Sequence, residues 1–266
     1  MPVEKSQYKK TQSIIIKNRK GQNISVLVDK PQNPEGLAIV MHGLGGSKEQ
    51  PHVAIFAEAF KESGYTVVRF DTTNTFGESD GRYEDATVTN YYEDLEDVIV
   101  WAKTQSWYVE PFCLVGHSLG GISIILYAEK HPEEIKGLAP ISTVVSGRLS
   151  AEAPKHSKTL REWEKSGWRE EKSISHPGRI KRLPWSHMVD RLKYDVLPEV
   201  NNLTMPVLLI VGEKDGSTPY KHQKLLYDKL PGKKELHVIK NAAHELNTQE
   251  PIMEIKRIFL KWIDKI

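Results

Sequence analysis

The chain has one cysteine, no long apolar segment and almost no net charge, and each shortage excludes a class of protein. The single Cys113 cannot form an internal disulfide or a thiolate metal site, so we expect a reducing, cytoplasmic environment. The apolar run Ile14-Ile15-Ile16 near the start is far shorter than a signal-peptide core or a spanning helix. These shortages argue against a disulfide scaffold and against membrane insertion.

The charge balance argues against a surface built for nucleic acid. Lys and Arg number 37 and Asp and Glu number 35, which gives a formal net charge of +2. The apolar fraction of 39 % in 266 residues is sufficient for a sizeable core. We therefore expect one folded domain over residues 1–266 with no nucleic-acid partner. The composition leaves the oligomeric state open, a dimer included.

The order of apolar patterns predicts a fold of the α/β class. Two short β-rich runs at 11–17 and 23–30 form an opening hairpin, and residues 37–41 are apolar at every position, which is typical of a strand buried on both faces. Helices and strands then alternate, which favours a mostly parallel sheet of about eight strands flanked by helices. The predicted helices are 51–62, 89–105, 119–130, 219–229 and 249–264, and the predicted strands are 65–70, 112–115, 137–141, 207–211 and 235–239.

Residues 144–204 interrupt this alternation. Four prolines prevent any long helix there, and twelve Lys or Arg face seven Asp or Glu between Arg148 and Asp195. A structureless loop of this length is improbable in a compact domain, so we predict a mostly helical cap insertion above the carboxyl edge of the sheet. Its basic excess either attracts acidic substrates or lies on a solvated helix face.

The insertion also holds three of the six tryptophans and three histidines. Trp163, Trp168 and Trp185 are candidates for a substrate pocket, and the alternative is that they form a small core of the insertion. The histidines are too far apart in sequence for a metal site on one helix, so we predict no metal and no organic cofactor. These histidines are His156, His176 and His187.

The sharpest chemical signal is Gly116-His117-Ser118-Leu119-Gly120, between a predicted strand and a predicted helix. Small residues on both sides of a serine allow a tight turn that exposes its hydroxyl and directs the helix N-terminus toward it. This setting predicts that Ser118 is a nucleophile. The alternative is a glycine-rich turn with an idle serine.

A nucleophilic serine needs a base and a group that orients the base. His244 follows a late strand in a loop of small residues, and Asp215 follows the strand 207–211. The order Ser, Asp, His is that of α/β-hydrolases. We therefore predict the triad Ser118, Asp215 and His244, with Glu213 as a less favoured acid.

Two backbone amides are expected to form an oxyanion hole. One is the amide of Leu119, which follows the nucleophile, and the other is that of Leu44 in the glycine-rich loop His42-Gly43-Leu44-Gly45-Gly46. We expect His42 to brace this loop and not to act as a second base.

Together these motifs resemble the α/β-hydrolase superfamily, and within it bacterial carboxylesterases of the cinnamoyl/feruloyl esterase and monoacylglycerol lipase type. The resemblance covers about residues 35–145 and 203–265, and in such esterases the place of 144–204 is taken by a cap that selects the acyl or alcohol group. The motifs are His42 to Gly46, Arg69-Phe70-Asp71, Gly77-Glu78-Ser79-Asp80-Gly81, Gly116 to Gly121, Asp215 and His244.

The residues and the resemblance together predict a serine carboxylesterase that acts on a small-molecule ester, hydroxycinnamoyl, short-chain acyl or monoacylglycerol in type. A thioester, amide, lactone or carbon–carbon bond is an alternative, because the triad is shared and the pocket decides the substrate. A hydrolase fold that only binds a small molecule is a third alternative.

Overall fold

An eight-stranded sheet forms the centre of the computed structural model, which describes residues 11–173 and 178–266. The strand order is β1-β2-β4-β3-β5-β6-β9-β10. Strands β1 and β2, and β2 and β4, are antiparallel, and the other neighbours are parallel. The strands are β1 Gln12–Lys17, β2 Asn23–Asp29, β3 Leu37–Met41, β4 Thr66–Phe70, β5 Phe112–His117, β6 Ile135–Ile141, β9 Val207–Gly212 and β10 Lys234–Ile239. The predicted α/β fold is confirmed.

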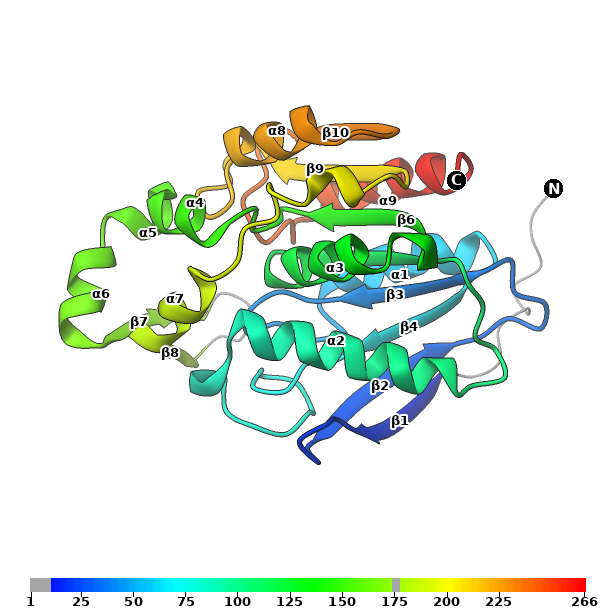
Figure 1. The fold of residues 1–266 in the computed structure, drawn as a ribbon, viewed down its shortest axis with the longest axis horizontal. Helices are drawn as coiled ribbons and strands as arrows, with labels where there is room; N and C mark the ends of the chain where they lie inside the picture. The colour runs from blue at the N-terminus through cyan, green and yellow to red at the C-terminus, as the bar shows by residue number, and fades with distance from the viewer. Residues whose placement is uncertain (1–10, 174–177) are drawn as a thin grey trace.

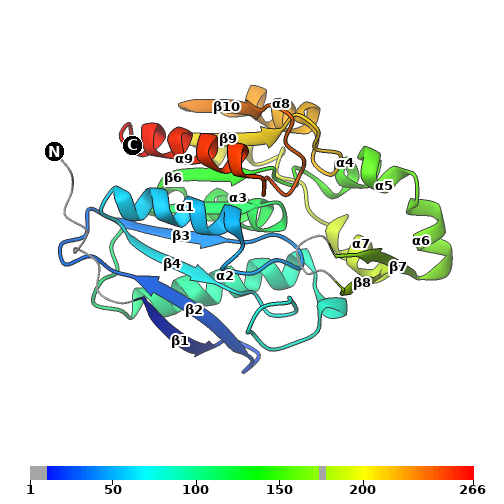
Figure 2. The same ribbon diagram turned by 180° about the vertical axis from the view of Figure 1, so that it is seen from behind.

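Helices cover both faces of the sheet (Figures 1 and 2). One face carries α1 and α9, and the other carries α2, α3 and α8. Because both faces are covered, β3 and β5 are buried at every position, as expected for central parallel strands. The helices are α1 Pro51–Glu62, α2 Val88–Lys103, α3 Leu119–Lys130, α8 Tyr220–Lys229 and α9 Gln249–Ile263, with short 3-10 turns at Tyr83–Asp85, Pro132–Glu134 and Val200–Asn202.

Local sequence signals explain where these helices begin and end. Helix α1 has Pro51 in its first turn, where the missing N–H is not needed, and Gly64 follows its end at φ 81°. Helix α2 is capped by Thr87, whose hydroxyl accepts a hydrogen bond from the Asn90 amide at 3.0 Å. All predicted boundaries of the sheet strands and these five helices lie within two residues of those observed.

Aromatic packing holds α1 and α9 together on one face. Phe56 and Phe259 stack with ring centroids 5.1 Å apart, and Trp262 lies edge-on to Phe259 at 6.4 Å. Cys113 is buried in β5 beneath these helices as a free thiol, as the sequence indicated. Within the part of the chain that the structure describes, no helix has the length and apolar character needed to span a bilayer.

The segment between β6 and β9, here called the 144–204 insertion, lies beyond the carboxyl ends of the parallel strands (Figure 1). It contains short helices, as predicted, and also an antiparallel hairpin that was not predicted. The missed β7 reads Trp-Arg-Glu-Glu-Lys and has no apolar alternation to mark it as a strand. The elements are α4 Gly147–Glu152, α5 Pro154–Ser157, α6 Leu160–Ser166, β7 Trp168–Lys172, β8 Ile180–Pro184 and α7 Trp185–Arg191.

Polar contacts fix the insertion to the start of α2. The Asp190 carboxylate accepts hydrogen bonds from the Thr89 amide at 3.1 Å and the Thr89 hydroxyl at 2.5 Å. His187 donates from Nδ1 to the Ala86 carbonyl at 2.7 Å. A carboxylate at a helix N-terminus is favoured by the helix dipole, so these contacts hold the insertion in place over the strand ends.

Candidate active site

Ser118 occupies the turn between β5 and α3, with a φ of 55° that a non-glycine residue seldom adopts. The flanking glycines allow this turn. A Cβ at Gly116 would lie 2.4 Å from the Gly120 carbonyl oxygen, and a Cβ at Gly120 would lie 2.5 Å from the His42 carbonyl oxygen. Glycine is therefore required two residues before and two residues after Ser118, because other backbone atoms pack directly against both positions.

The structure brings Ser118, His244 and Asp215 into one hydrogen-bonded line. The Ser118 hydroxyl lies 3.0 Å from Nε2 of His244, and Nδ1 of His244 lies 2.8 Å from Oδ2 of Asp215. The three residues follow β5, β10 and β9 respectively, so the carboxyl ends of three parallel strands meet here. The less favoured acid, Glu213, instead accepts a hydrogen bond from the Asn241 amide at 2.8 Å.

Asp215 is held by donors that favour its ionised form. The amides of Ser217 and Thr218 each donate to Oδ1 at 2.8 Å, and the Thr218 hydroxyl donates to Oδ2 at 2.8 Å. Burial raises the pKa of the carboxyl, but the adjoining His244 and the Thr218 donors outweigh burial, and the pKa of Asp215 lies below its ordinary value. The carboxylate is therefore charged throughout the neutral range.

The loop that carries Leu44 is fixed by hydrogen bonds to one carbonyl. The Gly43 carbonyl accepts from Nδ1 of His42 at 2.7 Å, from the Tyr91 hydroxyl at 3.1 Å and from the Gly46 amide at 2.9 Å. Nε2 of His42 in turn accepts from the Thr72 amide at 3.0 Å. His42 thus sits below the loop as a brace, away from the Ser118 hydroxyl.

Leu44 and Leu119 both line the cavity at Ser118. Neither amide donates a hydrogen bond to another of the described residues. Two unpaired N–H groups beside a serine hydroxyl are what an oxyanion would require.

The cavity beside Ser118 is small and polar, with a volume of about 80 Å³. Ligand pockets for larger organic molecules usually have volumes of ~300–1,000 Å³. The 144–204 insertion contributes eight of its lining residues, and all of them except Val144 are charged or polar: Val144, Ser150, Lys155, His156, Arg169, Glu171, Lys181 and Arg191.

The three predicted pocket tryptophans do not border this cavity. Trp163 is 2 % exposed, and its indole N–H donates to the Leu183 carbonyl at 3.0 Å. Trp185 packs edge-on against Trp163 with ring centroids 5.5 Å apart, whereas Trp168 is 37 % exposed on the hairpin. Trp163 and Trp185 therefore belong to a small core of the insertion, which is the alternative that the sequence left open, and Trp168 lies on the surface.

Sequence reasoning missed two histidines beside Ser118 and His244. His117 donates from Nε2 to the main-chain carbonyl of His244 at 2.9 Å, and its ring centroid lies 4.5 Å from that of His52. His52 is 3 % exposed, and neither ring nitrogen has a hydrogen-bond partner among the described residues. Burial lowers the pKa of His52 to about 3, so the ring is neutral. His52 lies in the predicted amphipathic helix 51–62, and nothing in that pattern indicated that its side chain would lie near Ser118.

The two described histidines of the insertion, His156 and His187, each accept a hydrogen bond from an arginine. Nδ1 of His156 accepts from Arg169 at 2.9 Å, and Nε2 of His187 accepts from Arg191 at 2.6 Å. His176 lies outside the described residues. Among the described side chains, the His, Cys, Asp and Glu atoms close enough to share a metal are those of His131, Glu133 and Glu134, at the end of α3 remote from this site.

The sequence profile of the family described as serine aminopeptidase, S33, matches residues 32–179 and 175–251. The chain belongs to this hydrolase family. Its curated relatives include the mitochondrial palmitoyl-protein thioesterase ABHD10 of Bos taurus, 27 % identical over 217 residues, which are 80 % of this chain and 68 % of the relative. The mouse protein of the same name is 27 % identical over 66 % of this chain and 58 % of its own length.

Solved structures with the same fold support the assignment to the α/β hydrolases. The ferulic-acid complex of Est1E from Butyrivibrio proteoclasticus has a TM-score of 0.76 at 22 % identity, and covers 95 % of this chain and 98 % of its own. Mouse α/β hydrolase domain-containing protein 10 also has a TM-score of 0.76 at 22 % identity, over 96 % of this chain and 99 % of its own. The α/β-hydrolase resemblance seen in the motifs is confirmed.

Proposed function

We propose that this family member is a serine hydrolase that cleaves carboxylic esters, thioesters included, through an acyl-enzyme. One observation carries the proposal: the imidazole of His244 bridges Ser118 Oγ at 3.0 Å and Asp215 Oδ2 at 2.8 Å. A serine hydroxyl becomes an effective nucleophile when a base removes its proton, and a carboxylate on the other ring nitrogen fixes the tautomer that does so.

In the first half of the proposed reaction, Ser118 Oγ attacks the ester carbonyl while Nε2 of His244 takes its proton. The carbonyl oxygen becomes an oxyanion, which the amides of Leu44 and Leu119 stabilise. The ionised Asp215 stabilises the imidazolium. His244 then donates the proton to the leaving alcohol or thiol, the carbon–oxygen or carbon–sulfur bond breaks, and the acyl group remains on Ser118.

In the second half, water takes the place of the alcohol. His244 removes a proton from the water, and the resulting hydroxide adds to the acyl carbonyl. The tetrahedral intermediate collapses, Ser118 receives the proton from His244, and the acid leaves. Every proton transfer in this cycle is assigned to Ser118, His244, water and the leaving group, so the proposed cycle needs no metal or organic cofactor.

Of the predicted acyl groups, the cavity favours the short-chain type. Its volume of about 80 Å³ and its charged lining offer little apolar surface to a long acyl chain. Est1E was solved with ferulic acid, and the ABHD10 relatives are named palmitoyl-protein thioesterases. Hydroxycinnamoyl esters, monoacylglycerols and thioesters should therefore be assayed as well.

The test compares wild type with Ser118→Ala on p-nitrophenyl acetate and on a matched thioester, together with labelling by a fluorophosphonate probe. We expect hydrolysis and labelling by wild type and loss of both in Ser118→Ala. Hydrolysis that persists in Ser118→Ala would contradict the proposal. Absence of labelling together with tight binding of an ester would favour a non-catalytic binding protein, and turnover of an amide panel in place of esters would favour an amidase.

The cytoplasmic location is also a proposal. It rests on the single buried free thiol of Cys113, which is compatible with a reducing compartment. Immunolocalisation or fractionation of the native protein decides it, and recovery in an organelle such as the mitochondrion, which the ABHD10 names specify for those relatives, would overturn it.

A further inference from the structure

Positive charge gathers on the side of the Ser118 cavity that the 144–204 insertion provides. Four of the charged lining residues are cations, namely Lys155, Arg169, Lys181 and Arg191, and two are carboxylates, namely Glu171 and Glu245. Glu171 lies 3.8 Å from the Lys155 ammonium, so one of these carboxylates already has a partner. The remaining cations border the space in which a substrate would sit.

Arg191 is a buried cation whose hydrogen bonds go to neutral groups. Only 3 % of the Arg191 surface is exposed. One terminal N–H₂ group donates to Nε2 of His187 at 2.6 Å, the other donates to the Ser150 hydroxyl at 2.8 Å, and Nε has no partner among the described residues. His187 is neutral, because burial holds the pKa of its ring well below the ordinary value. Burial also lowers the pKa of Arg191 to about 10, which leaves the guanidinium charged at neutral pH.

Arg169 repeats this pattern from the neighbouring hairpin. Its guanidinium donates to Nδ1 of His156 at 2.9 Å and lies over the Trp163 ring, 4.4 Å from the centroid. Its Nε is buried without a partner, as in Arg191. Within the described residues, no carboxylate oxygen lies within 4.0 Å of either guanidinium.

Arg191 is buried and Arg169 is half-buried, and neither forms an ion pair with another described residue. A guanidinium withdrawn from water without an ion-pair partner is costly for the protein alone. Arginine in such a position is typical of sites that bind a carboxylate or phosphate, because its planar fork matches two oxygens. The neutral histidines hold the guanidiniums in place without cancelling their charge. An anionic ligand in the cavity would supply the missing partner.

We propose that the substrate of this hydrolase carries a carboxylate besides the scissile ester, and that Arg169 and Arg191 bind this carboxylate while the ester lies at Ser118. The proposal rests on the proposed function, because both arginines border the same small cavity as Ser118 and His244. The size of that cavity places the two groups of the substrate close together. A monoester of a small dicarboxylic acid, or an ester of a small hydroxy acid, fits these requirements.

Two matched substrate pairs test the proposal and locate the carboxylate. The first pair, mono-p-nitrophenyl adipate and p-nitrophenyl hexanoate, differs in charge on the acyl side. The second, 4-acetoxybenzoate and its methyl ester, differs in charge on the leaving group. Rates of alkaline hydrolysis correct each pair for intrinsic reactivity. We expect wild type to prefer the anionic member of at least one pair by about 10-fold or more in kcat/KM, and Arg169→Gln to lower that ratio by about 10- to 100-fold.

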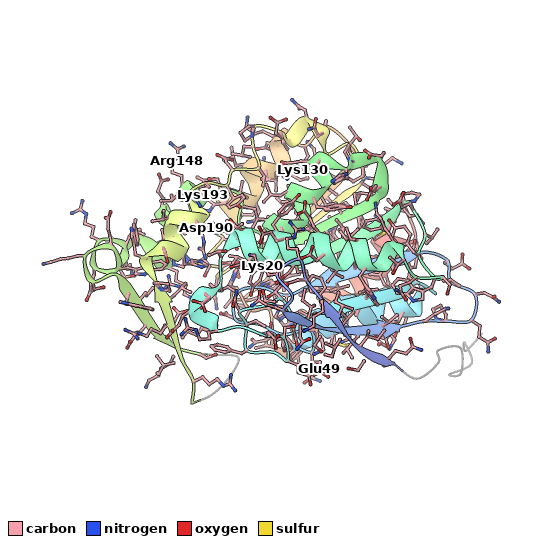
Figure 3. All side chains as sticks on the ribbon, turned by 60° about the horizontal axis from the view of Figure 1, so that its bottom comes forward. Lys20, Glu49, Lys130, Arg148, Asp190 and Lys193 are labelled. Atoms are coloured by element: carbon pink, nitrogen blue, oxygen red, sulfur yellow. The ribbon has the colours of Figure 1, made fainter. Side chains whose placement is uncertain are left out.

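Arg148→Gln is the matched control. Arg148 belongs to the same insertion but projects from α4 into solvent (Figure 3), so the variant makes the same change in net charge outside the cavity. We expect Arg148→Gln to show the same ratio of kcat/KM between the anionic and the neutral substrate as wild type. Arg191→Lys keeps the buried charge and removes the planar fork, and we expect an intermediate ratio. This variant supplies a second test of the site if Arg169→Gln does not fold.

Equal or better hydrolysis of the neutral member in both pairs would overturn the proposal, as would equal effects of Arg169→Gln and Arg148→Gln. Ser118→Ala separates this failure from failure of the proposed function. If hydrolysis depends on Ser118 and shows no charge preference, only the carboxylate site is wrong. If hydrolysis does not depend on Ser118, the proposed function itself is wrong.

Discussion

The imidazole of His117 donates a hydrogen bond to the main-chain carbonyl of His244 at 2.9 Å. The residue that precedes the proposed nucleophile therefore fixes the backbone of the proposed base. The two rings also lie close, with centroids 4.9 Å apart. The turn between β5 and α3 thus positions Ser118 directly, and it also positions His244 through the adjacent residue His117.

Loss of this donor should misplace the base. We expect His117→Phe to lower kcat by about 10-fold or more with a smaller change in KM, because small displacements of a catalytic group are costly. His117→Gln provides an amide donor at a similar distance along the side chain and should retain more activity than His117→Phe. Steady-state kinetics on p-nitrophenyl acetate measure both. Equal kcat in wild type and His117→Phe would contradict this role.

Replacement of Asp215, the proposed orienting carboxylate, should affect turnover far more than folding. We expect Asp215→Asn to lower kcat by about 10⁴-fold, since the amide no longer favours the required tautomer of His244. Glu213→Gln is the matched control, because Glu213 is the other acid in the same loop and accepts a bond from the Asn241 amide. Similar losses in the two variants would show that the acid had been assigned wrongly.

Acid should destabilise the chain through its buried neutral histidines. Burial lowers the pKa of His52 to about 3, whereas an unfolded histidine has a pKa near 6.5, so the unfolded state binds more protons as pH falls below 6.5. Stability contributed by the neutral ring is therefore present above pH 6.5 and is lost progressively below it. For His52 alone the loss at pH 5 is about 2 kcal/mol.

His52→Leu isolates this contribution. Removal of a buried ring with two unpaired nitrogens should flatten the dependence of unfolding free energy on pH between 7 and 5. Urea denaturation at several pH values measures the slope for wild type and variant. An identical slope in wild type and His52→Leu would contradict the assignment.

The turn at Ser118 should not tolerate a side chain at its second glycine, Gly120. A Cβ at Gly120 would lie 2.5 Å from the His42 carbonyl oxygen, so Gly120→Ala should lose about 1–3 kcal/mol of unfolding free energy. At Gly216 the nearest atom to an added Cβ is 4.0 Å away, and Gly216→Ala should be as stable as wild type. Thermal unfolding compares them, and equal melting temperatures would argue against the steric explanation.

The tryptophans of the insertion should separate into structural and surface residues. Trp163→Ala removes a buried indole that donates to the Leu183 carbonyl, and should cost about 3–5 kcal/mol. Trp168→Ala changes a partly exposed residue and should cost less than about 1 kcal/mol. Chemical denaturation measures both. A large loss of substrate affinity in Trp168→Ala without loss of stability would restore its predicted role in binding.

Much of the fold was predictable because the strong signals were local. Alternation of apolar strands with amphipathic helices predicted the sheet and five helices. The Gly-x-Ser-x-Gly motif identified Ser118, and the positions of Asp215 and His244 after later strands identified two residues that the structure links to it by hydrogen bonds. Each of these signals depends on neighbours in the chain or on the rule that parallel strands present their carboxyl ends together.

The insertion was harder to predict because its structure depends on contacts between distant residues. The strand Trp168–Lys172 forms through pairing with Ile180–Pro184 and not through an apolar pattern. Composition pointed to its tryptophans, yet the cavity is lined instead by Arg169 of β7 and Arg191 of α7. The position of Arg191 depends on the packing of α7 against the start of α2, and that of Arg169 on the pairing of β7 with β8. The basic excess was visible in sequence, but not which of its members face Ser118.

Strand β10 lies at one edge of the eight-stranded sheet, and the loop that follows it carries His244. Detachment of this one edge strand would remove the proposed base, His244, while the remaining strands and Ser118 stayed in place. Covalent labelling of Ser118 would then cease before the chain unfolds globally. A fluorophosphonate titration against denaturant would therefore report the local opening of one strand, and its midpoint would lie below that of the far-ultraviolet circular dichroism transition.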